Sequence, residues 1–118
     1  MAEETISLGS IYVAPRAIAT IAYYAALQSY GLVGLASKNL VNGLAQALVK
    51  DPTHGVEVRY DGANINIDLY IIIEYGTHIK SVAKSVSNTV RFQVQRALGV
   101  PVNEVNVHVR GLRVSSPD

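Results

Sequence analysis

Apolar and polar residues alternate in two neighbouring stretches of the chain. Residues 56–60 and residues 65–73 both place an aliphatic or aromatic side chain at every second position, with mostly polar residues between them. Such alternation is typical of a strand with one buried face. Asp61-Gly62 lies between the stretches, and this pair tolerates the positive φ angles of a type I′ turn. We therefore expect a long β-hairpin over about residues 55–75.

The sequence pattern predicts three further extended segments. A third alternating run, with valines on one face and polar residues on the other, predicts a strand over about residues 103–113. The wholly apolar residues 32–35 predict a short strand or turn. Residues 10–13 predict another short apolar strand.

Apolar residues spaced three and four positions apart predict three helices. The first covers about residues 15–29, the second about 38–49 and the third about 78–98. Thr77 is the expected N-cap of the third helix. Gly99 is expected to end that helix, because glycine adopts the left-handed conformation that closes many helices.

The three longest predicted strands each have one apolar and one polar face. This indicates a sheet with helices on one side and water or a partner on the other. We expect an α+β fold, a two-layer sandwich whose mixed or antiparallel sheet carries the helices on one face. The helix that follows the hairpin leaves room for a crossover to a parallel strand. No linker or repeat divides the chain, so we expect residues 9–114 to form one domain between loose termini at 1–8 and 115–118.

The composition excludes several kinds of chemistry. The 118 residues include no cysteine, which excludes disulfides and thiolate catalysis. A net charge of +1 argues against steering toward nucleic acid or anionic lipid. The acidic N-terminus lacks the apolar core of a signal peptide, so we expect a cytoplasmic protein. Residues 17–37 carry no charge, but alanines, polar residues and glycines interrupt the run, so we expect no direct membrane insertion.

The polar face of the sheet is the best candidate for an interaction surface. Its candidate residues are Glu57, Arg59, Asp68, Tyr70, His108 and Arg110. A catalytic alternative makes His108 a general base that Asp68 orients, but no nucleophile stands in a recognisable setting. We therefore favour binding and expect no catalytic residue. We also expect no cofactor and no metal site, because no pair of the three histidines has metal-ligand spacing.

Two helical surfaces are further candidates. Lys80, Lys84 and Arg91 form a basic stripe on the third helix and support a weak RNA-binding alternative, although three cations are ordinary for a solvated helix. The first helix is apolar nearly all round, which predicts either self-association or coverage by the second helix. The candidate self-association residues are Tyr23, Tyr24, Leu27 and Tyr30.

Four segments together resemble a known family. They are Tyr30-Gly-Leu-Val-Gly-Leu-Ala-Ser-Lys-Asn39, Gly55-Val-Glu-Val58, Ile65-Asn-Ile-Asp-Leu-Tyr-Ile-Ile-Ile-Glu-Tyr-Gly76 and Val105-Asn-Val-His-Val-Arg-Gly-Leu-Arg-Val114. They resemble the alkaline shock protein family, the envelope stress response family of mainly Gram-positive bacteria, over about residues 9–114. The first segment looks most like the subgroup often encoded beside a dihydroxyacetone-kinase-like protein. Ala14 stands where the family usually has a polar helix cap, so a weaker start to the first helix is expected.

The resemblance implies a role rather than a reaction. The family is cytoplasmic, is linked to cell-envelope homeostasis and often associates with the membrane through partner proteins. It carries no established activity or catalytic residue. We therefore expect a non-enzymatic, homo-oligomeric scaffold or regulator that contacts protein partners, such as a membrane-anchored protein or a kinase-like enzyme. The alternative is a regulatory partner of a lipid-metabolism enzyme such as a dihydroxyacetone-kinase-like (fatty-acid kinase) protein.

Overall fold

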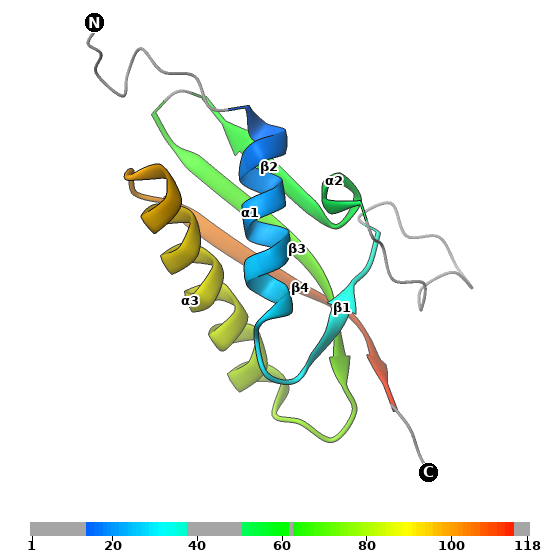
Figure 1. Cartoon of the computed structure of the whole chain (residues 1–118). Helices are drawn as coiled ribbons and strands as arrows, with labels where there is room; N and C mark the ends of the chain where they lie inside the picture. Colours follow the sequence, from blue (N-terminus) through cyan, green and yellow to red (C-terminus); the bar gives the residue numbers. More distant parts are fainter. Residues whose placement is uncertain (1–13, 38–50, 62, 115–118) are drawn as a thin grey trace, which may run out of the picture.

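The computed structural model describes residues 14–37, 51–61 and 63–114. The elements in chain order are α1 (Pro15–Leu27), β1 (Leu32–Leu35), α2 (Pro52–Gly55), β2 (Val56–Tyr60), β3 (Ile65–Glu74), α3 (Ile79–Leu98) and β4 (Glu104–Arg113). Figure 1 shows the strands as one layer, with α1 and α3 forming a second layer on one face of the sheet. The predicted α+β two-layer sandwich is confirmed.

β3 is the central strand of a mixed sheet. β2 pairs antiparallel with the first half of β3, and β1 pairs antiparallel with the second half. β4 pairs in parallel with β3 over its whole length, because α3 carries the chain back to the start of β3. The predicted hairpin and the crossover to a parallel strand are both present.

The core lies between the sheet and the two long helices. β3 contributes Ile65, Ile67, Leu69, Ile71 and Ile73, which alternate along the strand and are all buried. α3 contributes Val82, Val86, Val90 and Val94 at helical spacing. The alternation in the sequence therefore identified the buried face of β3 correctly.

The helix ends partly follow the sequence signals. Ala14 is the N-cap of α1 and makes no side-chain cap hydrogen bond, as expected. The prediction of Thr77 as the cap of α3 is wrong, because His78 holds that position. The Thr77 hydroxyl instead donates to the carbonyl of Glu74 at 2.7 Å and closes the turn after β3. Gly99 ends α3 with a φ of 74°, as predicted.

The hairpin turn lies one residue later than the Asp-Gly pair suggested. The N–H of Asp61 donates to the carbonyl of Asn64 at 3.4 Å. The Asp61 carboxylate accepts hydrogen bonds from the N–H groups of Asn64 and Ala63, and these bonds lower its pKa. Asp61 is thus the first residue of the turn, where its side chain satisfies two backbone donors, rather than one of the central pair.

Some predictions lie outside the described residues. These include the helix over about 38–49, the strand over 10–13 and both terminal segments. The short helix α2 (Pro52–Gly55) was not among the predicted helices. Within the described part of the chain, no helix is long and apolar enough to cross a membrane.

Candidate interaction surface

The open face of the sheet, opposite α1 and α3, carries a cluster of charged and aromatic side chains. The antiparallel register places Glu57 opposite Asp68, and the parallel register places His108 beside Tyr70. The residues that converge are Glu57, Arg59, Asp68, Tyr70, His108 and Arg110. They come from β2, β3 and β4, so the pairing of these strands assembles the cluster.

Asp68 lies at the centre of this cluster and is only 8% exposed. Arg59 Nη2 contacts its Oδ2 at 2.6 Å, and His108 Nε2 contacts its Oδ1 at 3.0 Å. Each carboxylate oxygen therefore has its own partner. An ionised carboxylate only accepts hydrogen bonds, so Nε2 of His108 must carry the hydrogen in this contact.

Two opposing effects set the pKa of Asp68. Burial raises the pKa, because the charged form loses hydration, while hydrogen bonds from His108 and Arg59 and the charge of Arg59 stabilise the carboxylate. The stabilising contacts prevail, and the pKa lies below its ordinary value of 3.8. The hydrogen bond between Arg59 and Asp68 also raises the pKa of Arg59. Asp68 is therefore a fixed negative charge at neutral pH.

Tyr70 forms the aromatic part of the cluster. Its ring stacks on the His108 ring, with centroids 4.8 Å apart and an interplanar angle of 14°. Arg110 Cζ lies 4.9 Å from the centroid of Tyr70, within reach of a cation–π contact. Burial, followed by the negative charges of Asp68 and Glu57, raises the pKa of Tyr70. The ring therefore stays neutral and holds both His108 and Arg110 in place.

Asn106 is a member of the cluster that the sequence analysis missed. Its side chain hydrogen-bonds to Asp68 and helps to keep that carboxylate ionised. The signal was present, because Asn106 precedes His108 by two positions in the same alternating run and so points to the same face.

The His108–Asp68 contact required by the catalytic alternative is present, but the described strands place no nucleophile beside it. The strand residues that the register places on the open face include no serine, threonine or cysteine to serve as a nucleophile. Arg59 also occupies one oxygen of Asp68. Among the described residues there is no group of three or more metal-ligating side chains. The cluster around Asp68 is suited to presenting charged side chains on the open face of the sheet.

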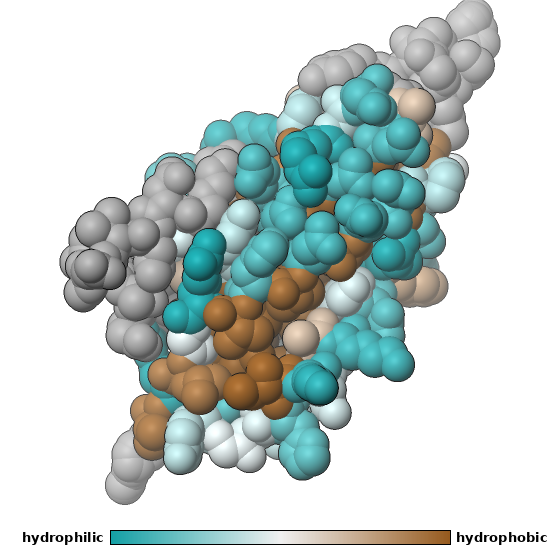
Figure 2. Space-filling view, turned by 180° about the vertical axis from the view of Figure 1, so that it is seen from behind, coloured by the Kyte–Doolittle hydropathy of each residue, from teal (hydrophilic) through white to brown (hydrophobic). Residues whose placement is uncertain are grey.

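Hydropathy divides the open face into two regions. Figure 2 views the molecule from behind the sheet, with hydrophilic side chains over the upper part and hydrophobic ones gathered below. Ile72 belongs to this face by register and lies between Gly34 and Gly111 of the neighbouring strands. The alternating pattern predicts Ile72 on the polar face, yet its side chain is fully buried.

The predicted self-association residues on and after α1 do not all lie at the surface. Tyr23 is 7% exposed and belongs to the core, because its position on α1 faces the sheet. Burial raises the pKa of its hydroxyl. Tyr24, Leu27 and Tyr30 are exposed. Self-association through these three residues stays a prediction.

The basic stripe on α3 contains fewer free cations than the sequence suggested. Lys80 and Lys84 are exposed. The Arg91 guanidinium donates instead to the carbonyl of Val102, where it links α3 to the segment before β4. Gln95 accepts a hydrogen bond from the N–H of Val102 at the same place. Arg91 therefore has a structural role at this junction.

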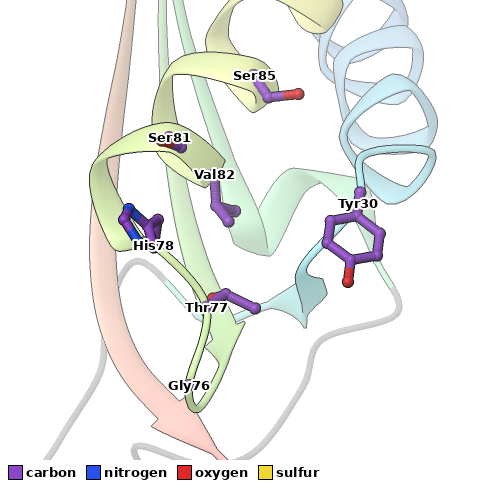
Figure 3. Close-up of a pocket in the computed structure, with 7 residues that line it drawn as sticks. All are labelled: Tyr30, Gly76, Thr77, His78, Ser81, Val82 and Ser85. Carbon is purple, nitrogen blue, oxygen red and sulfur yellow. The ribbon is translucent and has the colours of Figure 1, made fainter.

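A cavity of about 470 Å³ lies where β3 connects to α3. Figure 3 shows Tyr30 on one side of it and the first turns of α3 on the other. Its lining residues are Tyr30, Gly76, Thr77, His78, Ser81, Val82 and Ser85. The Thr77 hydroxyl already donates its hydrogen to the carbonyl of Glu74, so only its acceptor capacity remains for a ligand.

Comparison with known proteins identifies the relatives of this chain. Residues 3–114 match the alkaline shock protein 23 family, described by its cell envelope-related function. The chain is 43% identical over 111 residues to the uncharacterized protein YloU of Bacillus subtilis (strain 168), covering 92% of each chain. It is 34% identical over 90 residues to a stress response regulator gls24 homolog of Streptococcus pyogenes serotype M3, covering 66% of this chain and 50% of that protein.

Solved structures support the fold. The copper form of the MamM CTD superposes with a TM-score of 0.52 at 15% identity, covering 86% of this chain and 90% of that one. Identity this low establishes a shared fold only. The family match spans nearly the whole chain and agrees with the four resembling segments, and YloU is similar along nearly its whole length. This chain therefore belongs to the alkaline shock protein 23 family.

Proposed function

We propose that this chain is a non-enzymatic docking protein that binds a protein partner through the open face of its sheet. The observation that carries the proposal is the cluster around Asp68, in which a nearly buried carboxylate holds Arg59 and His108 while Tyr70 supports Arg110. The side chains of Arg59 and His108 remain 53% and 43% exposed. Their outer groups are thus fixed in position and still accessible.

Such an arrangement favours recognition of an acidic or polar protein surface. A guanidinium presents five N–H donors, and Asp68 Oδ2 engages only one terminal nitrogen of Arg59 at hydrogen-bonding distance. The remaining donors suit a partner carboxylate, and Arg110 supplies a second guanidinium nearby. Because neighbours already fix these side chains, binding costs less rotamer entropy than it would with free side chains.

The family supports the biological setting of the proposal. Its description links it to the cell envelope, and relatives include stress response regulators. We place the proposed docking event in the cytoplasm, in the response of the cell to envelope stress. In this setting the chain acts as a scaffold or regulator through contacts with other proteins and not by catalysing a reaction.

Co-purification from cells tests the proposal. The tagged full-length chain is crosslinked in cells of a Gram-positive host, and captured proteins are identified by mass spectrometry. Arg59→Ala should reduce recovery of a specific partner by roughly tenfold, as expected when a charged interface contact is lost. Lys84→Ala, on the opposite layer, is the matched control and should leave recovery unchanged.

The identity of the captured protein separates the two roles considered for the chain. A stoichiometric lipid-metabolism enzyme, such as a kinase-like protein, would specify a regulatory subunit. A membrane-anchored protein without enzymatic activity would specify a scaffold. Equal loss of capture by Arg59→Ala and Lys84→Ala, or no loss by Arg59→Ala, would overturn docking through the open face.

A further inference from the structure

We propose that the outer edge of β4 pairs with β4 of a second copy of this chain. The two strands run antiparallel about a two-fold axis at Val107, and the two sheets join into one. The proposal does not rest on the proposed function; Arg110 takes part in both, and the tests are separate because this one uses the purified chain alone.

The backbone of β4 has one pairing partner within the described residues. β4 pairs with β3 from Glu104 to Arg113, and none of the other strands of the sheet pairs with β4. A strand paired on one side directs about half of its N–H and C=O groups away from the sheet. A ten-residue edge of this kind is a template for another extended strand.

The charges on β4 are complementary to themselves when the strand is reversed. Glu104 is at the start of the strand, and Arg110 lies near its end. When Val107 opposes Val107 of the second copy, Glu104 opposes Arg110 in an antiparallel pair. Both side chains belong to the open face, so each pair forms on one side of the sheet. The symmetry creates two such ion pairs per dimer.

The helix-facing side of β4 supplies matching apolar contacts in the same register. Val105 opposes Val109, and the two copies of Val107 oppose each other. Val109 is 37% exposed in the single chain, although the parallel register aligns it with the core residue Ile71. Pairing would cover Val109, and cross-strand contacts between β-branched side chains stabilise a sheet.

The irregularity in β4 marks where the pairing would end. The register of β4 on β3 shifts after Val109, so Arg110 is an extra residue at a bulge. Bulges increase strand twist and discourage extended edge pairing. The segment from Glu104 to Arg110, which is symmetric about Val107 and ends at the bulge, is therefore the length that a second strand would use.

The exposed residues of the α1 region offer a competing self-association surface. Tyr24, Leu27 and Tyr30 provide apolar area there. None of the three carries a charge that would fix one register or orientation, whereas β4 carries charges of both signs at opposite ends. The competing interface is therefore one outcome of the test.

Exchanging the charges of Glu104 and Arg110 tests the proposed pairing of the β4 edge directly. Sedimentation of the purified full-length chain should show a concentration-dependent dimer. Glu104→Arg and Arg110→Glu should each weaken the dimer by roughly tenfold or more, because each variant replaces two attractive pairs by two repulsive ones. The double variant restores the complementary charges and should regain the original dissociation constant. Circular dichroism establishes that each variant is folded.

A cysteine placed at the proposed axis tests the register. The chain has no natural cysteine, so a variant carries one thiol. Val107→Cys should form a disulfide-linked dimer under mild oxidation, because directly opposed positions lie about 5 Å apart. Val105→Cys is the matched control, since its two copies would lie about 14 Å apart, four residue steps along the strand.

Several results would overturn the proposal. One is a chain that remains monomeric at high micromolar concentration. Another is a double charge variant that stays as weak as the single variants. A third is a dimer that Tyr24→Glu with Leu27→Glu dissociates while Val107→Cys fails to crosslink, which would assign self-association to α1. Loss of partner capture by Arg59→Ala alone would leave this proposal untouched.

Discussion

Asp68 is the residue on which the open face depends. Its lowered pKa means that the folded state stabilises the carboxylate more than the unfolded chain does. This contribution is fully present above the ordinary pKa of 3.8 and is lost as the pH falls from that value through the lower folded pKa. The stability that comes from the cluster should therefore disappear in acid.

Replacing Asp68 with asparagine tests this dependence. Asp68→Asn leaves Arg59 and His108 without their shared anion and should destabilise the fold near neutral pH by about 1–3 kcal/mol. Urea unfolding at a series of pH values measures the difference between variant and parent. The difference should shrink below about pH 3.8, where the parent carboxylate also becomes protonated. A difference independent of pH would contradict the assigned role.

Gly31 is a second residue whose replacement has a definite physical cost. Its φ is 87°, and an added Cβ would lie 2.7 Å from Cγ2 of Val82. Gly99 also has a positive φ, of 74°, but nothing lies within 4 Å of its added Cβ. Thermal unfolding should show that Gly99→Ala costs about 1–2 kcal/mol from backbone strain alone. Gly31→Ala should cost about 1–3 kcal/mol more from the steric overlap. Equal losses would show that Val82 moves aside freely.

At the scale of elements, the predictions succeeded where the sequence has a periodic pattern and one face of the element is buried along its whole length. β3 alternates along its length and is buried on its helix-facing side, so both its extent and its buried face followed from the sequence. The position of the hairpin turn did not, because two backbone donors bonded to the Asp61 side chain decide it. The partners of Asp68 depend on which strands neighbour β3, and alternation within one strand carries no such information.

The register of β3 can be tested by two substitutions on opposite faces. Ile71→Asp would bury a carboxylate in the core, where the parent side chain is fully buried, and should cost about 4 kcal/mol or more. Asn66→Asp preserves the oxygen that accepts a hydrogen bond from Asn103 and should cost little. Chemical unfolding measures both. A stable Ile71→Asp variant together with an unfolded Asn66→Asp variant would reverse the assignment of the two faces.

At the scale of the whole molecule, the two layers have different tasks. α1 and α3 cover the apolar side of the sheet and complete the core, as Figure 1 shows. The other side carries no described helix, and its charged cluster is held by contacts within the sheet itself. We therefore expect partners to be selected by the sheet and stability to be supplied by the helices.

Site-specific photo-crosslinking in living cells tests this division most directly. A photoreactive residue is introduced at Asn66 on the open face or at Lys84 on α3, and crosslinked proteins are separated by mass and identified. The account predicts a discrete adduct with another protein from position 66 and none from position 84. An adduct from position 84 alone would contradict the account, because it would place the partner on the helical layer.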